Sequence, residues 1–286
     1  MSQLLRANFS RLWKSGIFRL CILFSVGLSG FMVLMRYMDI QKHPEEYAKL
    51  SIEYSSVSGL LFVGALYLMF AAAVLVGIFV GTEYSDGTIR NKLIIGHRRP
   101  AIYLSNLIVC SAANGIVFLS HIATACILGK LLLTVGMPVK EILQFTLLEL
   151  LSFLALTALF VLLAMLIQSK AASSVTILIL SIILLFATLT IQQKLEAPEY
   201  YEAYSYINEE TGEVIEEQER EKNPNYLTGT KRQVYSFLND FLPSSQLYQV
   251  AMHESDHAGQ MAGYAGLLLL VSTGTGIIAF RRKDLK

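Results

Sequence analysis

The stretch from Gly81 to Asn106, GTEYSDGTIRNKLIIGHRRPAIYLSN, is a short charged segment between two long apolar runs. A charged side chain in hydrocarbon costs about 2.5–3.5 kcal/mol or more, so we expect this segment to lie in water. Its charged residues are Glu83, Asp86, Arg90, Lys92, Arg98 and Arg99.

The same segment carries the signals of a short helix, which we place at 83–96. Asp86 or Thr88 can accept a hydrogen bond from a free first-turn N–H, and Gly96 can take the left-handed conformation that closes a helix. Ile89 and Leu93 lie four residues apart and therefore share a face. A short helix with a small apolar face, held between two membrane spans, is suited to press on another protein.

The rest of the chain has the composition of a membrane protein. Of its 286 residues 54% are hydrophobic and only 16% are charged, which excludes a soluble globular protein. Six apolar runs are each about 20 residues or longer, enough to cross a bilayer as helices. They lie at 17–38, 57–81, 101–129, 143–167, 171–191 and 261–280. The predicted fold is an all-α membrane protein with six transmembrane helices.

Basic residues mark one side of this array. Four of them come before or at the start of the first span without an acidic residue among them, and others follow the second, fourth and sixth spans. By the positive-inside rule, that side is cytoplasmic and holds both termini. The four basic residues at the first span are Arg6, Arg11, Lys14 and Arg19.

The first residues of the chain predict an interfacial helix. Leu5, Phe9 and Leu12 fall at helical spacing, with basic residues on another face and Trp13 directly before the span. A basic amphipathic segment of this kind suits a helix in the inner headgroup layer. The alternative is a disordered basic tail that only sets the topology.

We divide the chain into three parts. Residues 1–191 hold the interfacial helix and five spans, 192–258 form an acidic extracellular segment, and 259–286 hold the sixth span and a basic cytoplasmic tail. Within the extracellular segment, the pattern predicts a β-hairpin turning at Thr211-Gly212. Residues 234–242 predict an amphipathic helix that Pro243 ends, followed by a short helix capped by Ser244 or Ser245. These two helices would form a hairpin that dips into the outer leaflet or closes a cavity, or else a solvated loop.

Two features inside the spans suggest packing or function. Small residues spaced as Gly77 and Gly81 allow close helix approach, and the shared face of Gly259, Gly263 and Gly266 predicts packing within or between subunits. Glu149 lies about two turns inside the fourth span, where a carboxylate is a functional candidate by default. We expect it to be partly wet, either facing a cavity on a substrate path or forming structural hydrogen bonds.

Signals for catalysis are sparse. The phosphate-binding pattern Gly-x-x-x-x-Gly-Lys-Ser/Thr does not occur, and we expect no catalytic residue, metal or cofactor on this chain. One segment, HESDH, fits His-Glu-x-x-His, in which two histidines one helical turn apart bind zinc. A zinc-dependent membrane hydrolase using His253, Glu254 and His257 is therefore one hypothesis for the function.

The chain resembles the permease subunits of type-2 ABC exporters, in particular the bacitracin-exporter-like branch of Gram-positive bacteria. The residues that carry the resemblance are Glu83 to Leu93, Gly96 to Arg99 and Tyr103 to Asn106. The basic N-terminal helix, the six spans and the segment FLPSSQ at 241–246 fit the same plan. The acidic insertion at 196–230 goes beyond it.

The resemblance implies that the segment after the second span is a coupling helix that docks on a separate ATPase. Ile89 and Leu93 would fill a groove of the ATPase, and Arg90 would pair with its surface acids. The implied coupling residues are Glu83, Asp86, Gly87, Thr88, Ile89, Arg90 and Leu93.

The resemblance also implies an assembly in the bacterial plasma membrane. Two permease copies would bind two ATPase subunits, which bind ATP and Mg, and no nucleic acid would be involved. The substrate moved outward would be an antimicrobial peptide or a lipid-like molecule. The alternative is a non-transporting sensor or immunity subunit that binds an antibiotic peptide through its extracellular segment.

Overall fold

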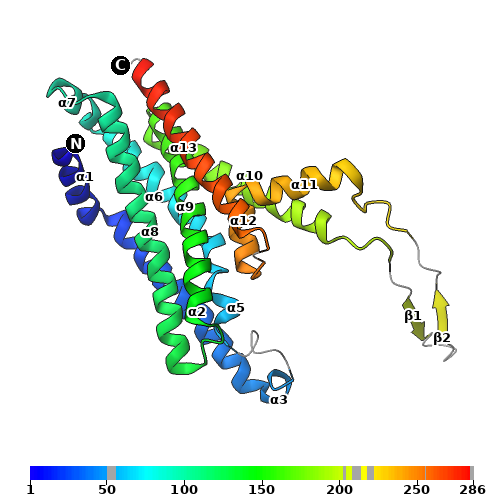
Figure 1. Ribbon diagram of the computed structural model, residues 1–286. Helices are drawn as coiled ribbons and strands as arrows, with labels where there is room; N and C mark the ends of the chain where they lie inside the picture. Colours follow the sequence, from blue (N-terminus) through cyan, green and yellow to red (C-terminus); the bar gives the residue numbers. More distant parts are fainter. Residues whose placement is uncertain (50–55, 202–203, 208–213, 218–221, 255, 284–286) are drawn as a thin grey trace.

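The computed structural model describes residues 1–49, 56–201, 204–207, 214–217, 222–254 and 256–283. Within them, six helical segments are long and apolar enough to cross a membrane, which confirms the predicted helical fold (Figure 1). They are α2 (Gly16–Lys42), α5 with α6 (Ser58–Leu61 and Gly64–Ser85), α8 (Arg99–Leu132), α9 (Val139–Ile167), α10 (Lys170–Glu196) and α13 (Ala258–Arg282). The shorter elements are α1 (Ser2–Lys14), α3 (Pro44–Tyr47), α7 (Thr88–Ile94), β1 (Tyr204–Ile207), β2 (Val214–Glu217), α11 (Gly229–Phe241) and α12 (Pro243–Ala251).

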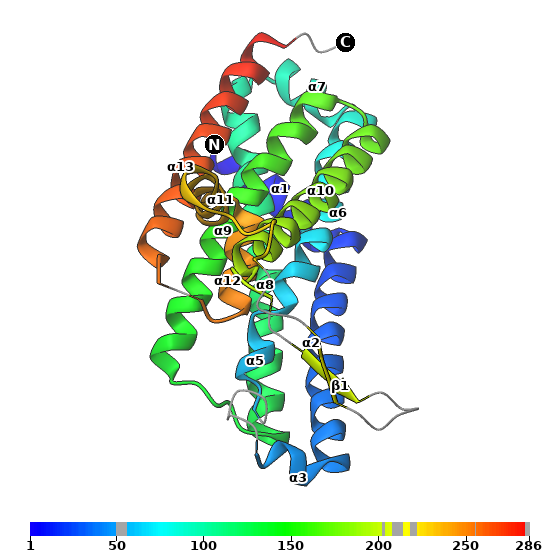
Figure 2. The same cartoon turned by 90° about the vertical axis from the view of Figure 1, so that its right-hand side faces the viewer.

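The helix α1 and the end of α13 lie at the same end of the bundle. Figures 1 and 2 show α1, α7 and the C-terminal end of α13 together at this end, and α3 at the opposite one. We call the two the near end and the far end. The basic residues of α1, of the 90–99 segment and of the last turn of α13 therefore gather at the near end, as their spacing along the chain predicts.

The helix α1 forms as its amphipathic pattern predicts. Leu4, Asn8 and Leu12 are buried on one face, which packs against α8, while Arg6 and Lys14 are exposed. Ser15 adopts an extended conformation between α1 and α2. A polar residue, Asn8, thus lies in the middle of a buried face.

The helices α6 and α9 form the centre of the bundle. In each of these spans, more than half of the residues in the most apolar stretch of 18 are buried. In α2, α10 and α13, less than a third of the corresponding residues are buried. The peripheral helices therefore keep long apolar faces outward, as expected for helices that meet lipid or another subunit.

The small residues of α6 produce one close helix crossing. A Cβ placed on Gly77 would lie 2.7 Å from Ser174 Cα, and one on Gly81 would lie 2.7 Å from Lys170 Cα. The predicted close approach is confirmed, and its partner is the N-terminal part of α10. By contrast, a Cβ on Gly259, Gly263 or Gly266 would meet nothing within 4 Å, so these glycines form no close crossing with another described helix.

We expect Gly77→Ala and Gly81→Ala each to lower the free energy of unfolding by about 1–3 kcal/mol, because the added methyl meets backbone rather than a movable side chain. Thermal unfolding of the purified protein in detergent measures the effect. Gly274→Ala is the matched control, because a Cβ there enters open space. Equal melting temperatures for all three variants would contradict the crossing.

The helices α11 and α12 pack onto the bundle. The helix α11 lies against α10, and α12 packs against α6, α9 and α10 with Leu247, Val250 and Ala251 buried. The solvated-loop alternative is therefore wrong for α12. The helix α10 also extends five residues beyond the predicted end of the fifth span, to Glu196.

The predicted caps of α12 are wrong. The N-cap is Leu242, with Pro243 in the first turn, and Ser244 and Ser245 lie inside the helix. Their hydroxyls instead meet α10, where Thr188 Oγ1 donates to Ser244 Oγ at 2.9 Å and lies 3.1 Å from Ser245 Oγ. The cause is tertiary: a helix inserted among apolar neighbours needs partners for its hydroxyls, and Thr188 supplies them.

The strands β1 and β2 pair antiparallel, with Ile207 opposite Val214 and Tyr204 opposite Glu217. This confirms the two predicted strands. The expected turn at Thr211-Gly212 lies outside the described residues.

Candidate functional site

The transition from α6 to α7 depends on a glycine. The helix α6 ends at Ser85, Gly87 has a φ of 67°, and α7 begins at Thr88. Neither Asp86 nor Thr88 caps α7, because its N-cap is Gly87 and no side chain accepts a hydrogen bond there. The predicted left-handed Gly96 is confirmed, with a φ of 95°. The predicted helix at 83–96 is thus the last turn of α6, a tight turn and the two-turn helix α7.

Glu83 is the centre of a buried charge cluster, contrary to the expectation that it lies in water. It belongs to the last turn of α6 and is fully buried. Arg11 Nη1 of α1 lies 2.7 Å from its Oε1, and Asn106 Nδ2 of α8 donates to its Oε2 at 2.7 Å. Lys92 Nζ of α7 forms a second ion pair with Oε1. One carboxylate therefore joins four helices.

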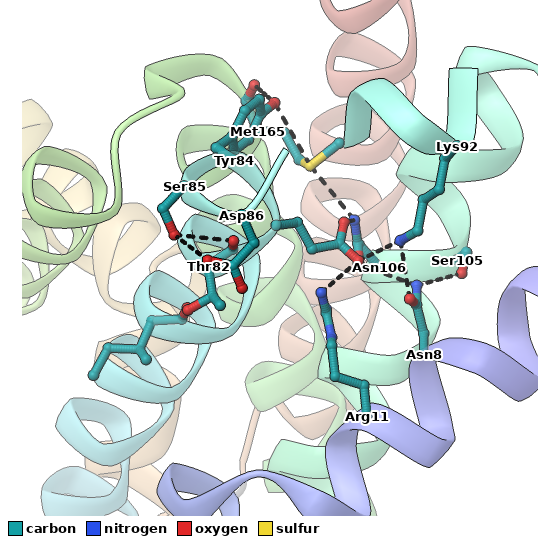
Figure 3. A network of polar contacts seen from close by, with 12 residues as sticks. Asn8, Arg11, Thr82, Tyr84, Ser85, Asp86, Lys92, Ser105, Asn106 and Met165 are labelled. Carbon is teal, nitrogen blue, oxygen red and sulfur yellow. Dashed lines mark hydrogen bonds and ion pairs between the residues drawn. The ribbon is translucent and has the colours of Figure 1, made fainter. Parts of the chain in front are cut away.

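Asn8 completes the cluster from α1. Its Oδ1 accepts a hydrogen bond from Lys92 Nζ at 3.0 Å, and its Nδ2 donates to Ser105 Oγ at 2.7 Å and to Asn106 Oδ1 at 3.2 Å. Figure 3 shows Asn8, Arg11, Lys92 and Asn106 pointing toward one another from α1, α7 and α8. We refer to Asn8, Arg11, Glu83, Lys92, Ser105 and Asn106 as the charge cluster.

Two cations, Arg11 and Lys92, share the single carboxylate of Glu83 in this cluster. The guanidinium of Arg11 lies over the ring of Phe79, 3.9 Å from its centroid, and is only partly exposed. Burial lowers the pKa of Lys92, while the carboxylate of Glu83 beside it opposes that shift. A buried ion pair of this kind is costly to break, because the remaining charge loses its partner without regaining water.

Two further contacts tie the near end together. Tyr84 Oη of α6 donates to the carbonyl of Met165 at 2.6 Å, in the last turn of α9. Arg99 Nη1 of α8 donates to the carbonyls of Phe280 and Arg281 at 3.3 and 3.1 Å, in the last turn of α13. Both use carbonyls that a helix C-terminus leaves without a partner. These hydrogen bonds join α6 to the last turn of α9 and α8 to the last turn of α13.

The exposed face of α7 differs from the predicted one. Ile89 is only 1% exposed and Leu93 is half-buried against the core, so Ile89 stabilises this chain and cannot fill a groove of another protein. The exposed residues are Arg90 and Asn91, followed one turn later by Ile94 and Ile95, which are 81% and 76% exposed. We refer to Arg90, Asn91, Ile94 and Ile95 as the α7 outer face.

Glu149 is placed differently from the expectation that it is partly wet. It is fully buried in α9, and its carboxylate oxygens have no hydrogen-bond partner among the described residues. A cavity of about 950 Å³ on this part of α9 is lined by its neighbours Leu148 and Leu151 but not by Glu149. Glu149 therefore does not line this cavity.

The zinc-hydrolase hypothesis is wrong. The motif requires one helix, whereas α12 ends at Ala251 and α13 begins at Ala258, so His253, Glu254 and His257 lie between helices. His253 Nε2 lies 3.1 Å from the carbonyl of Ser58, and His257 Nδ1 lies 3.1 Å from Asp240 Oδ2. Each ring thus has its own partner, Ser58 for His253 and Asp240 for His257. Among the described residues, no group of three potential metal ligands occurs.

Sequence comparison places the chain in a family. A family model described as ABC-2 family transporter protein matches residues 4–188, more than half of the chain. The match contains the whole charge cluster and α7, but not α11, α12 or α13. Comparison with the curated proteins found no significant match. The chain therefore belongs to the ABC-2 family of transporter proteins, the membrane components of ABC transporters, whose ATPase is a separate chain.

Proposed function

We propose that this chain is the permease subunit of an ATP-driven exporter, with its near end and both termini in the cytoplasm. The family match supports a transporter subunit. The basic residues of α1, of the 90–99 segment and of the end of α13 support the orientation, because cytoplasmic loops carry the excess of lysine and arginine.

In this proposal, two copies of the chain form the membrane core and two ATPase subunits bind it from the cytoplasm. The ATPases bind ATP and Mg, because the permease sequence has no phosphate-binding loop of its own. The outward apolar faces of the peripheral helices leave room for both lipid and a second permease copy.

One observation carries the proposal: α7 presents two exposed isoleucines on one side and a buried ion pair on the other. Ile94 and Ile95 dock in the ATPase, and the charge cluster transmits the motion of α7 to α1, α6 and α8. Asp86, Gly87 and Thr88 form the turn that holds α7 at its angle, and Arg90 pairs with acids of the ATPase. These roles are mechanical rather than catalytic.

We further propose that the exporter belongs to the bacitracin-exporter-like branch and contributes to antibiotic resistance. Its substrate is an antimicrobial peptide or a lipid-like molecule. The acidic composition of residues 192–222, at the external side in this orientation, favours a cationic substrate, because an acidic surface attracts positive charge.

The test is reconstitution of the chain with its ATPase in proteoliposomes, followed by a screen of cationic peptides and lipids. We expect a subset of them to stimulate ATP hydrolysis and to be moved across the membrane in the presence of ATP and Mg. A chain that binds no ATPase after co-expression would contradict the proposal.

A sensor or immunity subunit is the second candidate, favoured by the paired strands β1 and β2 in an acidic segment outside the family match. A ligand-binding segment of this kind matters more to a sensor than to a pump. The same experiment separates the two functions: stimulated ATP hydrolysis without transport supports the sensor, and transport supports the exporter.

A further inference from the structure

A cavity of about 950 Å³ lies between α9 and α13, toward the far end of the bundle. The N-terminal third of α9 forms one wall and the first turns of α13 form the other, and residues of the α8–α9 loop close it. Its size is at the upper end of the range for pockets that bind small organic ligands. None of its lining residues belongs to α7, and its α13 wall lies outside the family match.

The cavity exists because the facing residues of α13 are small. Ala258, Gly259 and Ala262 line it, and a Cβ on Gly259 would meet nothing within 4 Å. On the opposite wall, Phe145 and Leu148 supply an apolar surface. The body of the cavity therefore suits an apolar chain or ring.

One edge of the cavity is polar. Glu141 and Gln144, one turn apart on α9, are exposed and line it, as do His253 and Ser58. The 3.1 Å contact between His253 Nε2 and the carbonyl of Ser58 fixes the loop after α12 to the start of α5. The ring of His253 also lies 5.8 Å from that of Phe145. The polar edge is thus built by three separate segments.

The charge of the lining is negative. Glu141 is the one charged side chain among the lining residues, and it makes no ion pair within the described part of the chain. An apolar body with a single carboxylate at its edge is complementary to a molecule with an apolar segment and a cationic head. An anionic head would meet the carboxylate without a compensating cation.

The cavity has an apolar residue exposed at its edge. Leu147, beside Leu148 on α9, lines the cavity and is 66% exposed. A ligand that partitions into the bilayer can reach the cavity there without passing through the centre of the bundle.

We propose that this cavity binds a cationic amphiphile, with its apolar segment between α9 and α13 and its amine or guanidinium at Glu141. This site is additional to the proposed transport function and does not depend on it. The cavity would recognise the alkyl chain and the primary amine of its ligand. An aminophospholipid and a cationic lipopeptide both carry these two groups.

The test uses the full chain in phosphatidylcholine nanodiscs, without ATPase, and a long-chain alkylamine bearing a diazirine as the probe. After photolysis, we expect labelled peptides from 137–151 and 253–262. Gly259→Leu fills the cavity and should reduce this labelling by about tenfold, the effect of 1.4 kcal/mol in binding. The matched control Gly263→Leu also adds a side chain in open space on α13, but outside the lining, and should label as the wild type.

The charge is tested separately. Glu141→Gln should reduce labelling by the amine without reducing labelling by its N-acetylated, neutral form. Unlabelled phosphatidylethanolamine in the nanodisc, or palmitoyl-Lys-Lys added from aqueous solution, should compete with the probe and reduce labelling. The better competitor identifies the occupant as a lipid or as a lipopeptide. The proposal is overturned if Gly259→Leu labels as the wild type, if the neutral form labels as strongly as the amine, or if neither competitor acts.

Discussion

Replacing Glu83 with glutamine is expected to lower the free energy of unfolding by about 3–5 kcal/mol, the cost of leaving a buried charge unpaired. The side chain keeps its size, so packing is preserved. However, Arg11 and Lys92 lose their counter-charge. The NH₂ group of the new glutamine is itself a hydrogen-bond donor and cannot accept from the N–H donors that surround it. Thermal unfolding in detergent, monitored with the folded fraction after size-exclusion chromatography, measures the loss.

Asp86→Asn is the matched control for Glu83→Gln. It also removes one carboxylate, three residues further along the chain, but Asp86 is exposed and accepts a hydrogen bond from the neighbouring Ser85. We expect its stability to change by no more than about 0.5 kcal/mol. If Glu83→Gln proved as stable as Asp86→Asn, the charge cluster would not hold the four helices together.

The double variant Ile94→Asp, Ile95→Asp is expected to abolish association with the ATPase while the permease stays folded. Both side chains are largely exposed, so the exchange changes the stability of this chain little. It does place two carboxylates on the apolar surface that we propose to contact the ATPase. Co-purification with the ATPase should fall to background, and substrate-stimulated ATP hydrolysis should disappear.

Two controls separate docking from folding. Ser85→Asp also adds a carboxylate at an exposed position of the near end, but away from the α7 outer face, and should leave association intact. Ile89→Asp should reduce the amount of folded permease itself, because Ile89 is buried in this chain. Normal association of the Ile94, Ile95 double variant would exclude the α7 outer face as the docking surface.

The sequence was sufficient to predict the membrane-spanning helices. Each span is a run of apolar residues long enough to cross a bilayer, and hydrocarbon requires such a segment to satisfy its own backbone as a helix. The close helix crossing at Gly77 and Gly81 could also be predicted, because the spacing of two small residues is a local feature of the sequence. Only its partner, the N-terminal part of α10, needed the structure.

The charge cluster could not be predicted, because its partners are distant in the sequence. Hydropathy indicates that an isolated Glu83 belongs in water, but Arg11 and Asn106 bring opposite charge and a hydrogen bond from two other helices. One available signal was Asn8, a polar residue in the apolar stripe of α1, since a polar group on a buried face implies a polar partner.

The orientation of α7 was missed for a related reason. Ile89 and Leu93 share a face, as predicted, but that face is the one that packs against this chain. Two adjacent isoleucines at the end of a short helix, Ile94 and Ile95, were the overlooked signal. Two adjacent residues show no helical periodicity. However, Ile94 and Ile95 do not share the helix face of Ile89 and Leu93, so they stay exposed when that face is buried.

Site-specific photo-crosslinking tests most directly whether α7 meets the ATPase. With p-benzoyl-phenylalanine at position 94, irradiation of membranes that contain both chains should join the permease to the ATPase, whereas the same group at position 278, exposed on α13, should not. A crosslink from position 278 but none from position 94 would contradict the proposal that the α7 outer face receives the motion of the ATPase.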